Sequence, residues 1–150
     1  MTARTRILGV DYGSVRIGLA VSDPDCKIAS PLDTIERRGP ERDAANFCGI
    51  VERQGIGQIV VGLPLHLSGR QGQMAAEARA FGRWLGEATG LPVTFADERL
   101  TTVEAESALW DAGLTHAKRK TRRDRVAAQM LLQAYLDAGC PPEPAGPLEE

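Results

Sequence analysis

The sequence contains no apolar run of the about 18 to 20 residues that a membrane-spanning helix requires. Histidine is scarce, with two residues in the chain. Cysteine is scarce too, since the three cysteines, Cys26, Cys48 and Cys140, are far apart and form no C-x-x-C pair. These absences argue against a membrane protein, a structural zinc site and a disulfide scaffold. We expect a cytoplasmic protein in which any metal ion is held by carboxylates, which favour magnesium or manganese.

The length and composition are those of one globular domain. The chain has 150 residues, of which 43% are hydrophobic and 25% are charged. A chain of this size can bury a sizeable core without disulfides or metals. Its last eleven residues contain four prolines and three glutamates. We expect residues 1–138 to form a single domain and residues 139–150 to be a flexible tail.

The formal net charge is −2, but the basic residues are concentrated in one place. Six of the 18 Lys and Arg residues lie in the basic segment, residues 118–125; they are Lys118, Arg119, Lys120, Arg122, Arg123 and Arg125. The remainder of the chain has a net charge of −7. The basic segment is either a solvated charged turn or a contact for a polyanion. Because neighbouring like charges repel, we favour a contact with nucleic-acid phosphates.

Short apolar runs bounded by turn residues predict five strands, at residues 7–11, 16–24, 27–34, 58–64 and 93–96. The first two are separated by a short turn and predict an antiparallel hairpin. The third contains Pro31, which favours an edge strand or an irregularity. The fourth is continuously apolar, which indicates burial on both faces and therefore a parallel neighbour.

Apolar residues at helical spacing predict helices between and after the later strands. One follows the third strand and ends at Gly55, and the next places Phe81 and Trp84 at core spacing. Thr101–Glu104 is typical of a capped helix start, and a last helix begins at Asp124. The element order is β-β-β-α-β-α-β-α-α. It predicts an α/β fold with a mixed five-stranded sheet, a three-strand meander followed by alternating strands and helices, with helices on both faces.

Acidic residues lie at the ends of three predicted elements. Asp11 ends the first strand, Asp97 and Glu98 end the last, and Asp124 begins the final helix. Each has a structural alternative, as a turn former, an ion-pair partner or a helix-terminal residue. A carboxylate at the end of an apolar strand is costly unless it is solvated, paired or metal-bound. If the first and last strands lie close together, these carboxylates predict a divalent-cation site, and strand alternation admits only one of Asp97 and Glu98 to it.

Four motifs, in this order, resemble the YqgF family over roughly residues 6 to 138. They are Leu8–Gly13 with Arg16–Gly18, Val61–Pro64 with Gly69, Asp97–Thr102, and Asp124–Leu136. The resemblance implies a ribonuclease-H-like fold. It also implies that Asp11, Glu98 and Asp124 are the catalytic, metal-binding carboxylates, with Asp97 as an alternative ligand, and that two Mg²⁺ or Mn²⁺ ions are bound.

The resemblance implies a metal-dependent endonuclease that acts on structured nucleic acid. Family members are described as nucleases that mature the 5′ end of pre-16S rRNA and as Holliday junction resolvases, and the sequence does not choose between RNA and DNA. The alternative is a non-catalytic nucleic-acid-binding or ribosome-assembly factor on the same fold. We expect contacts to nucleic acid from Arg16, Lys118, Arg119, Lys120, Arg122 and Arg123, and either a monomer or a homodimer. The loop after Pro64 departs from the family pattern, which leaves the role of His66 and of residues 65–72 open.

Overall fold

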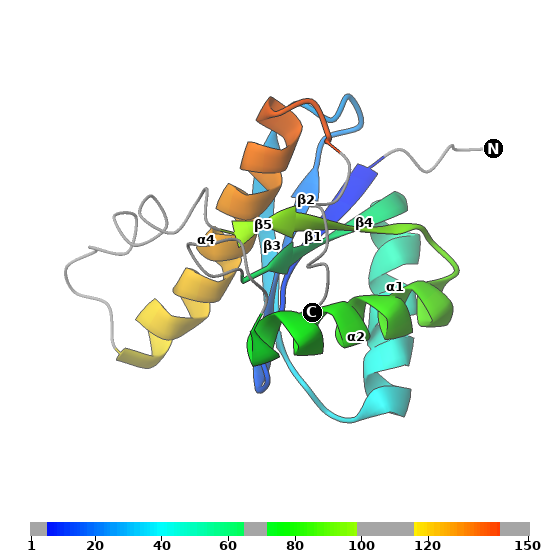
Figure 1. Cartoon of the computed structure of the whole chain (residues 1–150), viewed down its shortest axis with the longest axis vertical. Coiled ribbons are helices and arrows are strands. Elements are labelled where there is room, and N and C mark those ends of the chain that lie inside the picture. The colour runs from blue at the N-terminus through cyan, green and yellow to red at the C-terminus, as the bar shows by residue number, and fades with distance from the viewer. Residues whose placement is uncertain (1–5, 65–71, 99–115, 142–150) are drawn as a thin grey trace.

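The computed structural model describes residues 6–64, 72–98 and 116–141, with the backbone alone for residues 116–124 (Figure 1). The predicted helix start at Thr101–Glu104, the loop at 65–71 and residues 142–150 of the expected tail lie outside the described residues.

A mixed five-stranded sheet forms the centre of the molecule. The first three strands, β1 (Arg6–Asp11), β2 (Arg16–Ser22) and β3 (Ala29–Glu36), form an antiparallel meander. Strand β4 (Ile56–Leu63) pairs parallel with β1, and β5 (Val93–Asp97) pairs parallel with β4. The order across the sheet is β3-β2-β1-β4-β5. This arrangement confirms the predicted mixed sheet and the parallel neighbour of the continuously apolar strand.

Strand β3 lies two residues further along the chain than predicted, at Ala29–Glu36 rather than 27–34. It is an edge strand, and its register against β2 shifts where Pro31 pairs with Ala20. Proline has no N–H to donate to a strand ladder, so an edge position with an irregularity accommodates it. The residues before β3 form a turn instead, because the Asp23 carboxylate accepts the backbone N–H groups of Lys27 and Ile28 at 2.7 and 3.0 Å.

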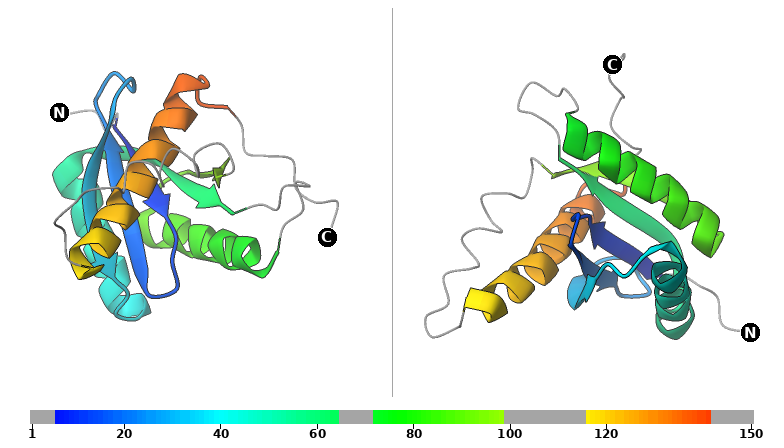
Figure 2. Two further views of the ribbon diagram at one scale, coloured as in Figure 1. Left: turned by 90° about the vertical axis from the view of Figure 1, so that its left-hand side faces the viewer. Right: turned by 90° about the horizontal axis from the view of Figure 1, so that it is seen from below.

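Helices α1 (Pro40–Gln54) and α2 (Gln73–Thr89) cover one face of the sheet (Figures 1 and 2). Their buried side chains join those of β1, β4 and β5 in the larger of the two core clusters, which includes Phe47, Phe81 and Leu85. The helices end at Gly55 and Gly90, whose φ angles of 66° and 74° lie in the left-handed region that glycine adopts without strain.

Helix α4 (His116–Asp137) covers the opposite face. Its Ala128, Leu132 and Tyr135 pack in a second cluster with Ile7 of β1 and Val60 of β4. The helix approaches β1 closely, since a Cβ atom on Gly9 would lie 2.9 Å from the Cβ of Leu132. Helices on both faces are therefore confirmed, and glycine in β1 allows α4 to lie against the sheet.

The prediction that the final helix begins at Asp124 is wrong. Helix α4 begins at His116, so the basic segment is helical rather than a turn and Asp124 lies more than two turns inside the helix. Lys and Arg are good helix formers, whereas repulsion between like charges one turn apart costs only a few tenths of a kcal/mol per pair. The first turns of α4 extend beyond the sheet (Figures 1 and 2).

Among the described residues, no helix combines the length and the apolar character that crossing a bilayer would require.

Candidate active site

The carboxyl ends of β1, β4 and β5 meet at one edge of the sheet, because these three strands run parallel. Asp11 is the last residue of β1, Asp97 is the last residue of β5, and Glu98 follows it directly. Strand β4 lies between β1 and β5. Acidic residues that are far apart in the sequence are therefore brought to the same edge.

Strand alternation places Asp11 and Glu98 on the face that α4 covers. In β1, Leu8 and Val10 belong to the cluster under α1 and α2, whereas Gly9 abuts Leu132 of α4, so Asp11 follows Gly9 onto that side. In β5, Phe95 faces α2 and Ala96 packs toward α4. Glu98 therefore lies on the α4 side and Asp97 on the other.

Gly62 of β4 leaves the space that Glu98 occupies. A Cβ atom on Gly62 would clash with Oε2 of Glu98 and would lie 2.8 Å both from its Cγ and from Cδ2 of Leu131 in α4. The Glu98 side chain thus runs across β4, between the sheet and α4. Any larger residue at position 62 would displace the carboxylate or the helix.

Burial and neighbouring acids raise the pKa of Glu98 to about 9. Desolvation is the largest cause; the charge of Asp11 and a hydrogen bond with its side chain follow, and the charge of Asp97 contributes least. A carboxyl with such a pKa holds its proton at neutral pH and shares it with its neighbour. The structure therefore brings Asp11 and Glu98 into contact, with Asp97 near enough to act on Glu98 through its charge.

The other predicted site residues are located mainly by their backbone positions. Arg16 begins β2, the strand that pairs with β1, and is half-buried at the same edge of the sheet. Position 124 precedes Ala128 by one turn and Leu131 by two, so it shares their row along α4. The side chains of Asp124, Lys118, Arg119, Lys120, Arg122 and Arg123 lie outside the described residues.

The donor set at this edge suits a hard divalent cation. Two carboxylates held in contact repel when both are ionised, and a cation between them relieves that repulsion while accepting oxygen ligands. Within residues 6–64, 72–98 and the described part of α4, no group of three or more candidate ligands is assembled. The described residues thus supply two oxygen-donor side chains, Asp11 and Glu98.

Gly62 is a site residue whose role the sequence did not reveal. A glycine inside a continuously apolar strand is a recognised signal of close approach by another group. The sequence does not say which group approaches, because that depends on the register between β4 and β5 and on the place where α4 crosses them.

A family model described as "RuvX: Holliday junction resolvase" matches residues 5–138. The chain belongs to the RuvX family. RuvX and YqgF denote the same family, so the family resemblance read from the four motifs is confirmed. Membership makes the chain a nuclease by family.

The chain is similar over most of its length to relatives to which the activity of a pre-16S rRNA nuclease is ascribed. It is 45% identical to one from Rhodopirellula baltica over 136 residues, which are 91% of this chain and 79% of the relative. It is 46% identical to one from Chloroflexus aurantiacus, covering 88% of this chain and 86% of the relative. It is 44% identical to one from Pelotomaculum thermopropionicum, covering 94% and 93%.

The fold is that of the RuvC-type resolvases. The structure of Thermus thermophilus RuvC in complex with a Holliday junction substrate matches with a TM-score of 0.58 at 17% identity, over 94% of this chain and 99% of RuvC. The Fowlpox virus resolvase in complex with Holliday junction DNA matches with a TM-score of 0.55 at 9% identity, over 91% of this chain and 99% of the resolvase. These likenesses confirm the predicted ribonuclease-H-like fold.

Proposed function

We propose that this RuvX-family chain is a divalent-metal-dependent endonuclease that cleaves phosphodiester bonds in structured nucleic acid, with the 5′ end of pre-16S rRNA as its substrate. The observation that carries the proposal is the contact between Asp11 and Glu98 at the carboxyl edge of the sheet. A protein that only bound nucleic acid would gain nothing from two half-buried acids beside its phosphates, because they repel the ligand.

In this proposal Asp11, Glu98 and Asp124 hold the cation. When bound, the cation would promote ionisation of the attacking water and stabilise the charge that develops on the phosphate and on the leaving oxygen. The protein positions the acids: β1 and the residue after β5 present Asp11 and Glu98, and α4 presents position 124 in the row of Ala128 and Leu131. Gly62 and Leu131 restrict the Glu98 side chain.

The remaining contacts in the proposal are electrostatic. The basic segment lies on the part of α4 that extends beyond the sheet, where Lys and Arg can reach phosphates that flank the cut (Figure 2). Arg16 lies at the edge that Asp11 occupies and would contact the phosphate backbone there. The three cysteines are free, which supports a place of action in the reducing cytoplasm.

Resolution of branched DNA is the second candidate, and the description of the family model as that of a Holliday junction resolvase favours it. The relatives at 44 to 46% identity favour the rRNA substrate. A resolvase acts on a two-fold symmetric junction and needs two sites, so a dimer would accompany this candidate, whereas a monomer suffices for trimming one RNA end.

One experiment tests the function and separates the two candidates. The full chain is incubated with a pre-16S rRNA fragment that includes the 5′ extension and with a four-way DNA junction, in Mg²⁺ and in chelator. We expect the RNA to be cut at a defined position in Mg²⁺ and to stay intact in chelator. A cut in the junction alone would select the second candidate, and the absence of cleavage of both would refute the proposed function.

A further inference from the structure

A cavity of about 460 Å³ opens on the side of the sheet that α1 and α2 cover. Its lining includes Tyr12, Arg37, Asp43, Glu77, Phe81 and Trp84. Tyr12 directly follows Asp11 and packs on the opposite face of the sheet. One lining residue of the cavity is therefore the chain neighbour of Asp11, and the cavity volume is in the range of small-molecule sites.

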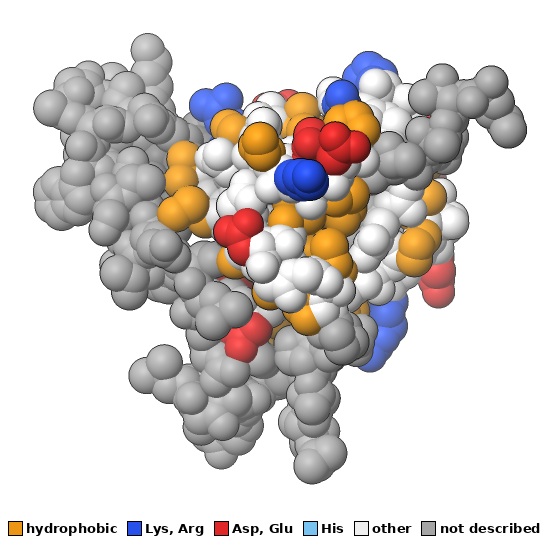
Figure 3. Space-filling model, turned by 90° about the horizontal axis from the view of Figure 1, so that it is seen from above, with side chains coloured by type: hydrophobic (Ala, Val, Ile, Leu, Met, Phe, Trp, Pro, Cys, Tyr) orange, Lys and Arg blue, Asp and Glu red, His pale blue; other side chains and the backbone are white. Residues whose placement is uncertain are grey.

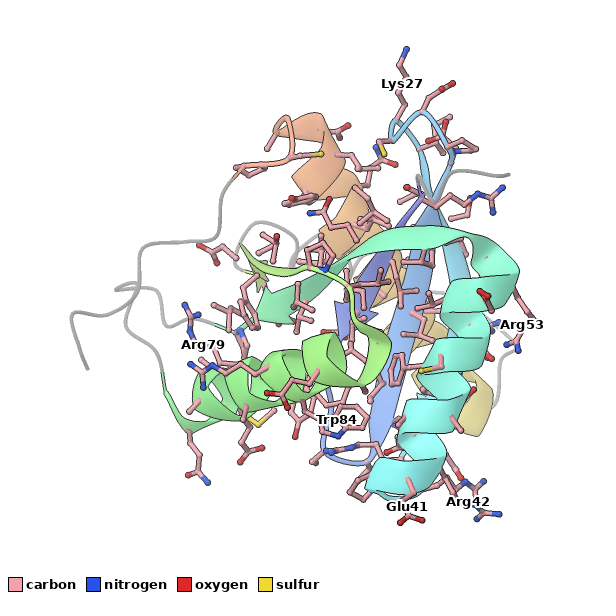
Figure 4. All side chains as sticks on the ribbon, turned by 90° about the vertical axis from the view of Figure 1, so that its right-hand side faces the viewer. Lys27, Glu41, Arg42, Arg53, Arg79 and Trp84 are labelled. Carbon is pink, nitrogen blue, oxygen red and sulfur yellow. The ribbon has the colours of Figure 1, made fainter. Side chains whose placement is uncertain are left out.

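Aromatic rings form the cavity wall. The ring of Phe81 lies 5.0 Å from that of Tyr12 and 5.4 Å from that of Trp84, measured between centroids. Phe81 is buried in the core, whereas Trp84 is only partly buried and reaches from α2 toward α1 (Figure 4). The guanidinium of Arg37 lies 5.2 Å from the Tyr12 ring and donates a 3.0 Å hydrogen bond to its hydroxyl.

Two acidic side chains of the lining, Asp43 and Glu77, supply hydrogen-bond acceptors to the cavity. Asp43 is 4% exposed, and its Oδ1 accepts the backbone N–H of Arg38 at 2.9 Å. Within the part of the chain that the structure describes, its carboxylate accepts no other hydrogen bond. A carboxylate has about four acceptor positions. Glu77 is half-buried and receives a 3.4 Å hydrogen bond from Gln73. A ligand with paired N–H donors and a flat apolar face complements such a cavity.

We propose that this cavity receives an unpaired nucleobase of the nucleic acid that the chain cleaves, and that guanine fits it best. This inference rests on the proposed function, which supplies the nucleic acid. Aromatic and guanidinium groups stack on splayed-out bases in single-stranded RNA recognition. Guanine presents two adjacent donors, N1–H and the N2 amino group, which one carboxylate accepts together. Uracil presents one N–H between two carbonyl oxygens, which the acidic side chains repel. The sugar phosphate stays outside, beside Arg37.

The test measures mononucleotide binding, which needs no cleavage. Fluorescence of Trp84 is followed in a Trp110→Phe background, in chelator, during titration with 5′-GMP and with 5′-UMP. We expect GMP to quench Trp84 and to bind about tenfold or more tightly than UMP, because a site built on hydrogen bonds rejects a ligand that lacks the donors. Glu77→Gln should remove most of this preference. Glu87→Gln is the matched control, an exposed residue on the same helix outside the cavity lining, and should change nothing.

Asp43→Asn replaces one carboxylate oxygen with an amide N–H₂ and keeps the oxygen that accepts the backbone N–H of Arg38. It therefore tests whether the Asp43 carboxylate accepts hydrogen bonds from the base. If this variant fails to fold, Glu77→Gln alone decides. Equal binding of GMP and UMP, or an unchanged preference in Glu77→Gln, would overturn the inference. Tighter binding of arginine amide than of GMP would also overturn it, since the cavity would then be a cation site for a protein partner. Cleavage of RNA without GMP binding would refute this inference and leave the proposed function standing. GMP binding without cleavage would refute the proposed function.

Discussion

At the scale of single residues, the raised pKa of Glu98 makes the stability of the protein depend on pH. The folded chain holds a proton that the unfolded chain releases near pH 4.5 and that the folded chain releases near pH 9. Between these values the folded state binds more protons, so its free energy of unfolding falls as pH rises. We expect urea unfolding in chelator to show a loss of up to about 1.4 kcal/mol per pH unit across this window.

Glu98→Gln is the control for that measurement, because the amide keeps the shape of the side chain and does not titrate. In the variant, the free energy of unfolding should depend much less on pH between pH 5 and 9. Outside this range its pH dependence should match that of the wild type. Identical slopes in the variant and the wild type would show that Glu98 ionises normally in the folded chain.

Asp11→Asn should remove the charge that helps to raise the pKa of Glu98, so that the folded state loses less free energy by holding that proton at neutral pH. Without metal the variant should melt at or above the wild-type temperature, and relief of about 1 kcal/mol corresponds to about 3 °C for a chain of this length. Mg²⁺ should raise the melting temperature of the wild type by mass action and that of the variant much less. A variant that melts well below the wild type, with neither protein responding to Mg²⁺, would identify Asp11 as a structural turn residue.

The contact between Asp11 and Glu98 could be anticipated from the sequence, because both acids end apolar strands and strand alternation favours Glu98 over Asp97. The role of Gly62 could not, since it depends on where α4 crosses β4. The cavity beside Tyr12 could not be anticipated either. Phe81 and Trp84 lie at ordinary core spacing, and only the tertiary arrangement places Arg37 and Asp43 beside them.

At the scale of elements, α4 differs most from the prediction. The basic segment was expected to precede the helix as a turn, but it is part of the helix, and the apolar row from Ala128 to Tyr135 anchors that helix against the sheet. Tertiary packing of one part of a helix stabilises the remainder. The positions of the strands, by contrast, followed closely from their apolar runs and turn residues.

Replacing Lys118, Arg119, Lys120, Arg122 and Arg123 with Ala should weaken binding to unrelated nucleic-acid sequences alike. It should also reduce the magnitude of the slope of log affinity against log salt concentration by up to about four, if all five residues contact phosphate. Filter binding at a series of salt concentrations measures the slope. Arg42→Ala with Arg53→Ala, two exposed positions on α1 (Figure 4), is the control and should leave the slope unchanged. An unaltered slope in the five-residue variant would remove the basic segment from the interface.

At the scale of the whole molecule, the two faces of the sheet carry different groups of functional side chains. The face that α4 covers carries the carboxylate pair and the helix that contains the basic segment, whereas the face that α1 and α2 cover carries the aromatic cavity. On the described part of the surface in Figure 3, basic and acidic side chains are interspersed with apolar ones and do not form a patch of one sign. Because the chain has a net charge of −7 outside the basic segment, the proposed function requires a polyanion to be attracted at α4 and repelled elsewhere.

The most direct test of the nuclease site compares Glu98→Gln with Asp97→Asn in single-turnover cleavage of the pre-16S rRNA fragment in Mg²⁺. The two residues are neighbours in the sequence, but strand alternation places only Glu98 beside Asp11 on the α4 side. We expect Glu98→Gln to lower the rate by about 100-fold or more, while Asp97→Asn retains measurable cleavage. The reverse ranking, or equal and substantial activity in both folded variants, would contradict the assignment of the site to the Asp11–Glu98 pair.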